Sequence, residues 1–114
     1  MRKINGITNE PKQVLSVPLD DGSTFELTLS YMPRRENWVI VNLQHLDFSL
    51  KGYRIYNSPN ILHQFRNLIP FGIGCFSVED REPMLLEDFQ SGNTELYVLD
   101  SEETERYWRF ISGT

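Results

Sequence analysis

The stretch RNLIPFGIGC, residues 66–75, is an apolar run interrupted by one proline and two glycines. The positions of these three residues decide which fold the sequence predicts. Pro70 fixes its own φ and offers no backbone N–H donor, which suits the entrance of a strand. Gly72 and Gly74 lack a Cβ, so they allow a bend or close backbone packing. Together with the apolar Phe71, these residues predict a central strand that is entered through a bend and closes a small curved sheet. Approach of another subunit's backbone to the same glycines is the alternative explanation.

Outward from this stretch, the N-terminal half of the chain alternates apolar and polar residues, which is the pattern of half-buried strands. The clearest case is residues 23–31, where Phe25 and Leu27 share one face and polar residues occupy the other. Gly52 interrupts a later strand and predicts a β-bulge or a close backbone contact. Trp38 opens a strand and is predicted to pack in the core. The strands expected in this meander cover residues 12–19, 23–31, 38–46 and 47–57.

The second half of the chain predicts shorter elements. Residues 58–65 are expected to form a connector with one short helical turn, because Pro59 cannot donate to a sheet ladder. Residues 81–93 are compatible with a second helical turn, which Gly92 would end. A final strand is expected over residues 94–101.

The two ends of the chain are assigned by weaker signals. Asp100 and Glu103 have the spacing of a helix capping pair, whereas residues 107–111 alternate as a strand does. The alternation is favoured, so residues 102–114 are expected to form a closing strand or an extended tail. Residues 1–11 are expected to form a flexible N-terminal segment.

Length and composition favour one small folded domain. The chain has 114 residues, of which 39% are hydrophobic, and this predicts a single all-β domain over residues 1–114, built as a small antiparallel barrel or sandwich. The formal net charge of −5 argues against a strongly cationic nucleic-acid-binding surface. No apolar stretch approaches the ~20 residues that span a bilayer, so no membrane insertion is expected. The single cysteine excludes an internal disulfide and a thiolate zinc cluster.

Three residues are candidates for a nucleophile or a base, and none has supporting spacing. Cys75 stands next to Phe76 in an apolar setting that raises a thiol pKa, so it is expected to be an inert core residue. His45 shares its strand parity with Leu43, which favours a partly buried, hydrogen-bonded histidine. His45 and His63 without a third ligand make a poor metal site. The sequence therefore predicts no enzyme, no metal and no cofactor.

Aromatic residues and arginines are enriched at protein interfaces, and this composition indicates the candidate binding residues. The expected partner interface comprises Arg54, Tyr56, Arg66, Tyr107, Trp108 and Arg109. Alternation of Tyr53, Arg54 and Tyr56 leaves a base-stacking surface as a less favoured alternative. The positions expected to be critical for the fold are Trp38, Gly52, Pro70, Phe71, Gly72, Gly74 and Gly92.

The order of sequence elements also resembles a known family. The strands FELTLSY (25–31) and NWVIVNL (37–43) are followed by GYRIYNSPNILHQFRNLIPFGIGCFS (52–77) and EPMLLEDFQSGNTELYVLD (82–100). This order and spacing resemble the small plug proteins found at the centre of phage tail baseplates, a family first recognised in a cyanophage contractile tail. The resemblance covers most of the chain, and the acidic and aromatic tail after Asp100 departs from it.

The resemblance implies a structural virion protein that sits in the axial hub of the baseplate and obstructs or lines the tube channel until the tail opens. It implies the hub and spike proteins as partners, with the tape-measure protein as a further candidate. It also implies several copies around the tail axis, of which three would match a trimeric hub, and assembly in the host cytoplasm. No membrane and no specific nucleic acid are expected as partners. The alternatives are a β-barrel adaptor between proteins without a plugging role and, less favoured, a nucleic-acid-binding barrel.

Overall fold

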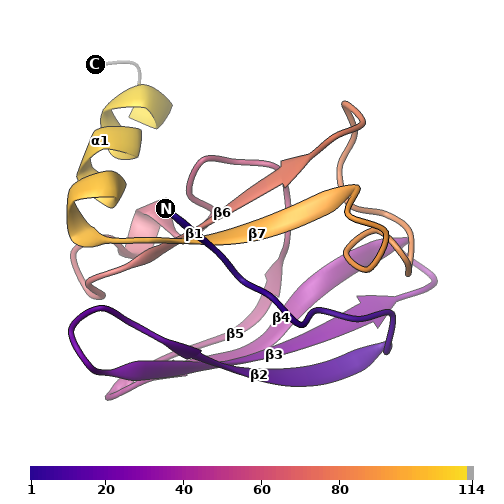
Figure 1. Cartoon of the computed structure of the whole chain (residues 1–114), viewed down its shortest axis with the longest axis horizontal. Coiled ribbons are helices and arrows are strands. Elements are labelled where there is room, and N and C mark those ends of the chain that lie inside the picture. Colours follow the sequence, from indigo (N-terminus) through magenta and orange to yellow (C-terminus); the bar gives the residue numbers. More distant parts are fainter. Residues whose placement is uncertain (113–114) are drawn as a thin grey trace.

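Two antiparallel β-sheets face each other and enclose one hydrophobic core (Figure 1). The computed structural model describes the backbone of residues 1–112 and the side chains of residues 1–109. The strand order is β2-β3-β4-β5 in the larger sheet and β1-β7-β6 in the smaller one. The strands of the described residues do not close into a barrel, so the predicted all-β class is confirmed in its sandwich form.

The larger sheet is the predicted meander of consecutive hairpins. Its strands are β2 (Lys12–Pro18), β3 (Thr24–Met32), β4 (Asn37–His45) and β5 (Phe48–Arg54). The turn between β2 and β3 contains Gly22 at a φ of 89°, a conformation that residues with a Cβ rarely adopt. The alternation in β3 buries Phe25, Leu27 and Leu29 completely, as predicted.

A β-bulge in β4 changes which of its side chains face the core. The register between β3 and β4 shifts by one residue, because Val41 has no partner on β3. Strand β4 therefore buries Trp38 and Ile40 before the bulge, and Leu43 and His45 after it. Trp38 is fully buried, which confirms its predicted place in the core.

Gly52 lies on the neighbouring strand β5, beside the bulge in β4. The residues on either side of it, Lys51 and Tyr53, pair with Asn42 and Ile40 of β4. Gly52 has a φ of 68°, and nothing lies within 4 Å of the place where a Cβ would stand. Conformation, and not a close backbone contact, is therefore what requires glycine at this position.

The smaller sheet recruits the N-terminal residues as its third strand. Strand β1 (Arg2–Lys3) pairs with β7 (Thr94–Leu99), which pairs in turn with β6 (Gly72–Ser77). Ile4 donates its backbone N–H to β7 at 2.8 Å and is only 5% exposed. The prediction of a flexible segment over residues 1–11 is therefore wrong for its first residues, which the pairing with β7 and the burial of Ile4 hold in place.

Strand β6 lies at the edge of its sheet, so the prediction of a central strand is wrong. The connector after β5 covers its outer edge instead. Ser58 and Cys75 exchange two backbone hydrogen bonds, of 2.9 and 3.0 Å, and Ile61 N–H donates to Ile73 O at 2.8 Å. The predicted helical turn follows in the same connector as a 3₁₀ helix, η1 (His63–Phe65). The connector thus satisfies backbone groups that an open strand edge would leave unpaired.

This covering explains why β6 needs two glycines. A Cβ on Gly72 would stand 2.6 Å from Asn60 Oδ1, and a Cβ on Gly74 would stand 2.9 Å from Pro59 O. Asn60 is buried and its Oδ1 accepts hydrogen bonds from Leu62 N–H (3.0 Å) and Ile73 N–H (3.1 Å). Both glycines therefore pack closely against the chain's own connector, Gly72 against the Asn60 side chain and Gly74 against the Pro59 backbone.

Replacing Gly72 by alanine is expected to lower the free energy of unfolding by about 1–3 kcal/mol, because the new methyl group displaces the Asn60 side chain from a packed site. Urea denaturation measures the loss. The same substitution in an Asn60→Ala background is expected to cost clearly less, since the clashing amide is gone. Equal costs in the two backgrounds would show that crowding by Asn60 is not the reason for glycine.

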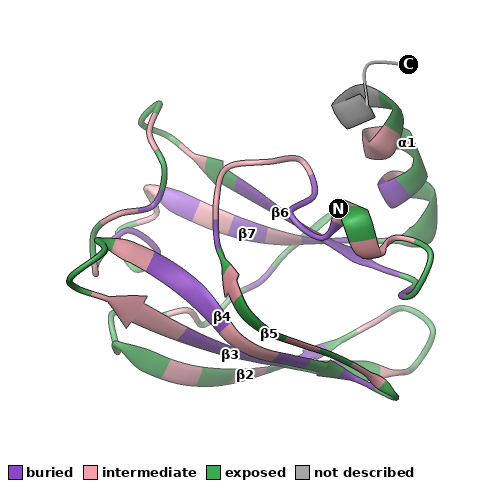
Figure 2. Cartoon of the chain, turned by 180° about the vertical axis from the view of Figure 1, so that it is seen from behind, coloured by how far each residue is buried: buried purple, intermediate pink, exposed green. Residues whose placement is uncertain are grey.

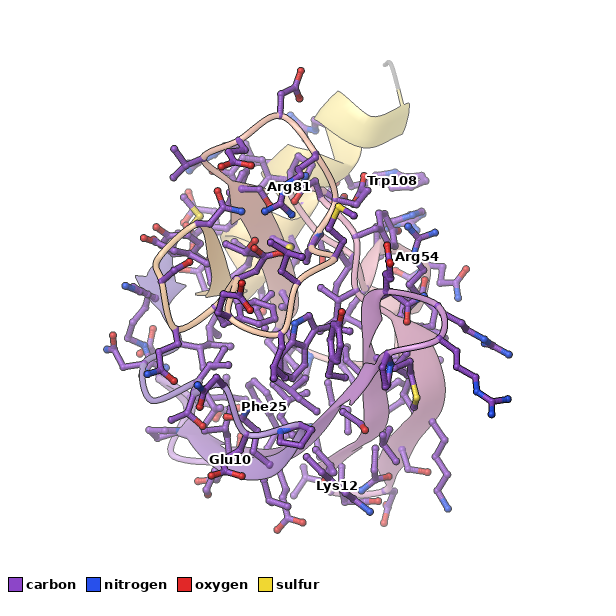
Figure 3. All side chains as sticks on the ribbon, turned by 90° about the vertical axis from the view of Figure 1, so that its right-hand side faces the viewer. Glu10, Lys12, Phe25, Arg54, Arg81 and Trp108 are labelled. Carbon is purple, nitrogen blue, oxygen red and sulfur yellow. The ribbon has the colours of Figure 1, made fainter. Side chains whose placement is uncertain are left out.

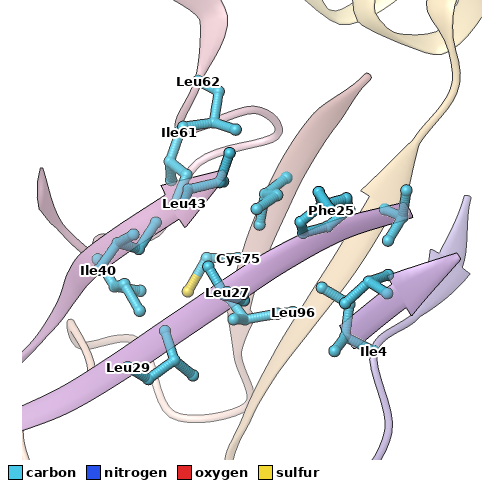
Figure 4. Close-up of a cluster of buried hydrophobic side chains, with 14 of the residues drawn as sticks. Ile4, Phe25, Leu27, Leu29, Ile40, Leu43, Ile61, Leu62, Cys75 and Leu96 are labelled. Carbon is cyan, nitrogen blue, oxygen red and sulfur yellow. The ribbon is translucent and has the colours of Figure 1, made fainter. Parts of the chain in front are cut away.

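The core lies between the two sheets and is continuous from one to the other (Figure 4). The rings of Phe25 and Phe71 stack across the interface with centroids 4.5 Å apart and planes 6° from parallel. Burial is concentrated on the facing sides of the strands, whereas much of β2 and β5 is exposed (Figure 2). The fully buried large side chains are Trp38, Phe25, Phe71, Leu27, Leu29, Ile40, Leu43, Ile55, Ile61, Leu62, Ile73 and Leu96.

The C-terminal segment is a helix, α1 (Ser101–Ser112), so the predicted closing strand or extended tail over residues 102–114 is wrong. Asp100 Oδ1 accepts from Glu103 N–H at 2.8 Å, and Glu103 Oε1 accepts from Asp100 N–H at 3.1 Å. This reciprocal capping box starts the helix and outweighs the alternation that follows it. Residues 113 and 114 of that prediction lie outside the described residues. None of the helices in the described part of the chain has the length and apolar character needed to cross a membrane.

Candidate functional site

The candidate nucleophile and base are built into the core. Cys75 is fully buried, and burial raises the pKa of its thiol to about 12, so the reactive thiolate is suppressed at neutral pH. His45 is 4% exposed, its Nε2 lies 3.0 Å from Ser23 Oγ, and its ring packs edge-on against Phe71. Both residues therefore have the packing roles that the sequence predicted for them.

The ionisable groups do not form a metal-binding cluster in the described part of the chain. No group of three His, Cys, Asp or Glu side chains there could hold a metal ion. An acidic hollow of about 250 Å³, with Asp20, Asp21 and Glu103 in its walls, lies beside the start of α1. The chain's own N-terminal ammonium at Met1 pairs with Glu103 in this hollow at 2.5 Å. Of the three carboxylates, Glu103 is thus paired with a cation supplied by the chain itself.

Residues 81–88 form a loop, here called the Asp88 loop, that is organised by one buried carboxylate. Both oxygens of Asp88 accept from the Arg81 guanidinium at 2.9 Å. Asp88 Oδ2 also accepts the backbone N–H groups of Met84 and Leu85, each at 2.9 Å. No pattern in the sequence predicted this arrangement, because it joins Arg81 and Asp88, seven residues apart, through an irregular loop.

The Asp88 loop anchors two aromatic residues of the larger sheet. Tyr31 Oη donates to Met84 O at 2.6 Å, and Trp38 Nε1 donates to Leu85 O at 3.1 Å. Burial alone would raise the pKa of Asp88, but hydrogen bonds from Arg81 and from the loop backbone lower it to about 2. Asp88 is thus a carboxylate at neutral pH, and its charge holds the loop over the end of the core.

A shallow hollow of about 600 Å³, here called the arginine hollow, lies beside the turn between β3 and β4. Its walls carry three arginines from two separate elements. One of these, Arg54, belongs to the predicted interface and is labelled in Figure 3. The residues that line it are Met32, Pro33, Arg34, Arg35, Asn37, Val39, Gly52 and Arg54. None of the three guanidinium groups makes an ion pair or a hydrogen bond with the residues described.

Local geometry explains why these arginines point outward. Residues 33–36 form the tight connection between β3 and β4, closed by Arg35 N–H donating to Met32 O at 3.2 Å. Glu36 takes a left-handed φ of 51°, which turns the chain back into β4. Arg54 ends β5 and pairs with Val39 of β4, so its side chain joins those of the turn.

A second aromatic and cationic group, here called the Trp108 cluster, connects α1 to the connector. The Arg66 guanidinium carbon lies 3.5 Å from the centroid of the Trp108 ring. The His63 ring stacks on the same tryptophan at 5.8 Å, with planes 19° apart. Two predicted interface residues, Arg66 and Trp108, are therefore brought together, but they contact each other and η1.

The other predicted interface residues are distributed between these places. Tyr56 is half-buried against the core, and burial together with its neighbour Tyr53 raises the pKa of its hydroxyl. Tyr107 and Arg109 lie on α1, where Tyr107 is half-buried and Arg109 is exposed. The six predicted residues thus do not form one surface. The structure adds Arg34 and Arg35 to Arg54, and the paired arginines of a turn were the sequence signal for them.

Deleting residues 104–114 is expected to lower the melting temperature by several degrees, because it removes the buried Thr104 and the stacking of Trp108 on His63 and Arg66. The domain should still fold, since the core cluster of the described residues ends at Val98. Differential scanning calorimetry of the two forms measures the shift. As a control, Arg106→Gln changes an exposed residue of α1 and should leave the melting temperature unchanged. Equal melting temperatures of truncated and full-length protein would instead make Trp108 an anchor for a partner.

The fold and the contacts described above define the class of protein to which the chain belongs. The described residues form a shared core, a loop held by Asp88, a hollow lined by three arginines and a cluster around Trp108, and this arrangement defines the class of small β-sandwich structural proteins. Residues 1–102 match the sequence model of a family described as Cyanophage baseplate Pam3 plug gp18. The chain belongs to this family of cyanophage baseplate plugs. No curated protein matches the chain.

Family membership gives the protein its setting. It is a structural plug protein of the phage tail baseplate, located in the virion and associated with other baseplate proteins. The match ends at residue 102, just inside α1, so most of the helix lies outside it. This boundary agrees with the departure from the family pattern that the sequence shows after Asp100.

Proposed function

We propose that the protein occupies the axial hub of the baseplate and obstructs or lines the tube channel until the tail opens. The observation that carries this proposal is the family match over residues 1–102, which covers both sheets and the connector between them. A plug acts by steric exclusion, so it needs a rigid body and surfaces that partners hold. Catalysis is no part of the proposed function.

The build of the domain supports a steric role. Its Cα atoms have extents of 33 × 31 × 22 Å, and eighteen buried side chains of the described residues form one core between the sheets. A plug must bind well enough to survive assembly and still be displaced when the tail opens. This favours an interface of standard size with polar contacts over a large apolar one. The arginine hollow has that mixed character.

The charge of the chain supports the same role. The net charge of −5 gives a surface that, on balance, repels the phosphates of DNA passing through the channel. The proposed partners are the hub and spike proteins, with the tape-measure protein as a further candidate. Several copies around the axis, three in a trimeric hub, and assembly in the host cytoplasm complete the proposal.

Electron cryo-microscopy of phage tails with and without the gene tests this function. Wild-type baseplates are expected to show density for the domain on the tail axis, and baseplates from the deletion phage should lack it. Adding purified protein to the deletion baseplates should restore the axial density. Density at the periphery of the baseplate would contradict plugging and would support an adaptor between proteins. Absence of the chain from purified tails would contradict both functions.

A further inference from the structure

The arginine hollow concentrates positive charge on a chain that is acidic overall. Arg34, Arg35 and Arg54 are three of its eleven basic residues, and they converge on one hollow from the β3–β4 turn and from the end of β5. Several other basic side chains in the described residues have partners: Arg81 binds Asp88, Lys3 lies near Glu95, and Arg66 stacks on Trp108. The guanidinium groups of the hollow have none among the residues described. They are therefore available to an anionic ligand.

The floor and wall of the hollow select among anionic ligands. Met32, Pro33 and Val39 give it apolar surface between the arginines. In the wall, Asn37 Oδ1 is buried and has no hydrogen-bond donor among the described residues. A buried acceptor without a donor is unfavourable. Because Oδ1 has almost no accessible surface, the Asn37 side chain must turn toward the hollow before this atom can accept from a ligand N–H, and relief of the missing hydrogen bond favours that turn.

A peptide has all three complementary features at once. Its carboxylates pair with guanidinium groups in bidentate geometry, its backbone supplies N–H donors, and an aliphatic side chain covers the apolar floor. A nucleic acid offers phosphates but no aliphatic side chain. Its long run of negative charge would also meet the net negative charge of the rest of the protein. The chemistry of the hollow thus favours an acidic peptide segment over a polynucleotide.

We propose that the arginine hollow is the docking site for an acidic segment of a protein partner, in which an aliphatic residue is flanked by aspartate or glutamate. The inference rests on the proposed function in that the partner is then a baseplate protein of the hub. The three arginines hold the carboxylates, the Asn37 side chain turns toward the ligand to accept a backbone N–H, and Met32 and Val39 contact the aliphatic residue. Salt weakens such a charged interface, and a reversible interface suits a plug that must dissociate from the hub when the tail opens.

Nuclear magnetic resonance titration of the full-length protein tests the inference. The probe is a twelve-residue synthetic peptide with one central leucine flanked by glutamates, and the matched control replaces every glutamate by glutamine. The acidic peptide is expected to shift the backbone amide signals of Arg34, Arg35, Asn37 and Gly52. The glutamine peptide should leave these signals in place. Raising the salt from 50 to 500 mM is expected to weaken binding of the acidic peptide about tenfold or more.

Variants locate the binding. The double variant Arg34→Gln/Arg54→Gln is expected to weaken binding of the acidic peptide at least tenfold, while Arg106→Gln on α1 should leave it unchanged. All three changes are at exposed positions, so the variants should keep the wild-type melting temperature. Unchanged affinity in the double variant, or signal changes centred on the Trp108 cluster, would overturn the inference.

Two further outcomes would name a different occupant and so overturn it. A single-stranded oligonucleotide of equal charge that binds the same residues more tightly than the peptide would show a polynucleotide site. Concentration-dependent shifts of the same signals without peptide would show that a second copy of the chain fills the hollow. The cryo-microscopy test is independent: axial density without peptide binding would overturn only this inference, and peptide binding with peripheral density would overturn only the plugging function.

Discussion

Replacing Trp38 by alanine is expected to lower the free energy of unfolding by about 3–5 kcal/mol, the range for removing a large aromatic side chain from a core. The side chain is fully buried. Its ring lies 5.2 Å from that of Phe89 in an edge-on contact and 5.5 Å from that of Tyr31. Its Nε1 also donates to Leu85 O, so the substitution leaves that carbonyl of the Asp88 loop without its donor. Packing and loop anchoring are therefore lost together.

Urea denaturation followed by circular dichroism measures the effect of Trp38→Ala, and Trp108→Ala is the matched control. Trp108 is the other tryptophan of the chain and is only half-buried, on the surface of α1, so its loss should cost clearly less. Trp38→Phe should keep most of the packing but lose the hydrogen bond, giving an intermediate stability. A loss below about 1 kcal/mol for Trp38→Ala would mean that the residue does not hold the core together.

Replacing Asp88 by asparagine is the second change expected to have a large effect, with a loss of about 3 kcal/mol at pH 7, the lower end of the range for breaking a buried ion pair. The side chain is 2% exposed, and its partner Arg81 is 25% exposed, which places the effect at that lower end. The variant weakens the contact with Arg81 and the hold on the Met84 and Leu85 N–H groups. Glu102→Gln is the control, because the pair of Glu102 and Arg106 is exposed and contributes little.

The effect of Asp88→Asn should depend on pH in a defined direction. The pKa of Asp88 is about 2 in the folded protein, lowered from its ordinary value of 3.8. A lowered folded-state pKa contributes stability above the unfolded-state value, and this contribution, about 2 kcal/mol, is lost as pH falls from about 4 to about 2. The difference in unfolding free energy between wild type and variant should therefore shrink over this window. A difference that stays constant from pH 7 to pH 2 would contradict a role for the Asp88 charge.

Elements with a strong local signal were predictable from the sequence. The alternation of Phe25, Leu27 and Leu29 fixes which face of β3 is buried, since side chains of a strand alternate between faces. Gly52 signals an irregularity because glycine alone takes its backbone conformation at low cost. The capping pair of Asp100 and Glu103 was also visible, but the alternation after it was given more weight. A reciprocal cap satisfies specific backbone donors, whereas alternation over five residues is a weak pattern.

Features that depend on contacts distant in the chain were not predictable in this way. The bulge at Val41 inserts one extra residue into β4, so the core-facing positions are even-numbered before it, as at Trp38, and odd-numbered after it, as at Leu43. No nearby residue in the sequence predicts this change. The edge position of β6 depends on a connector that returns to cover it. The arginine hollow needs the β3–β4 turn and the end of β5 side by side, so only the pairing of β4 with β5 brings Arg54 to Arg34 and Arg35.

The connector over β6 has a consequence for how this protein can associate. Residues 58–61 occupy the edge at which the smaller sheet could otherwise extend into a neighbouring chain. Strand addition and fibre growth are blocked there, since the backbone groups that would template them are already used. Copies gathered at high local concentration are thus prevented from merging through this sheet edge. A partner that binds at the β6 edge must therefore contact side chains. Such contacts can separate without breaking the backbone hydrogen bonds of the sheet.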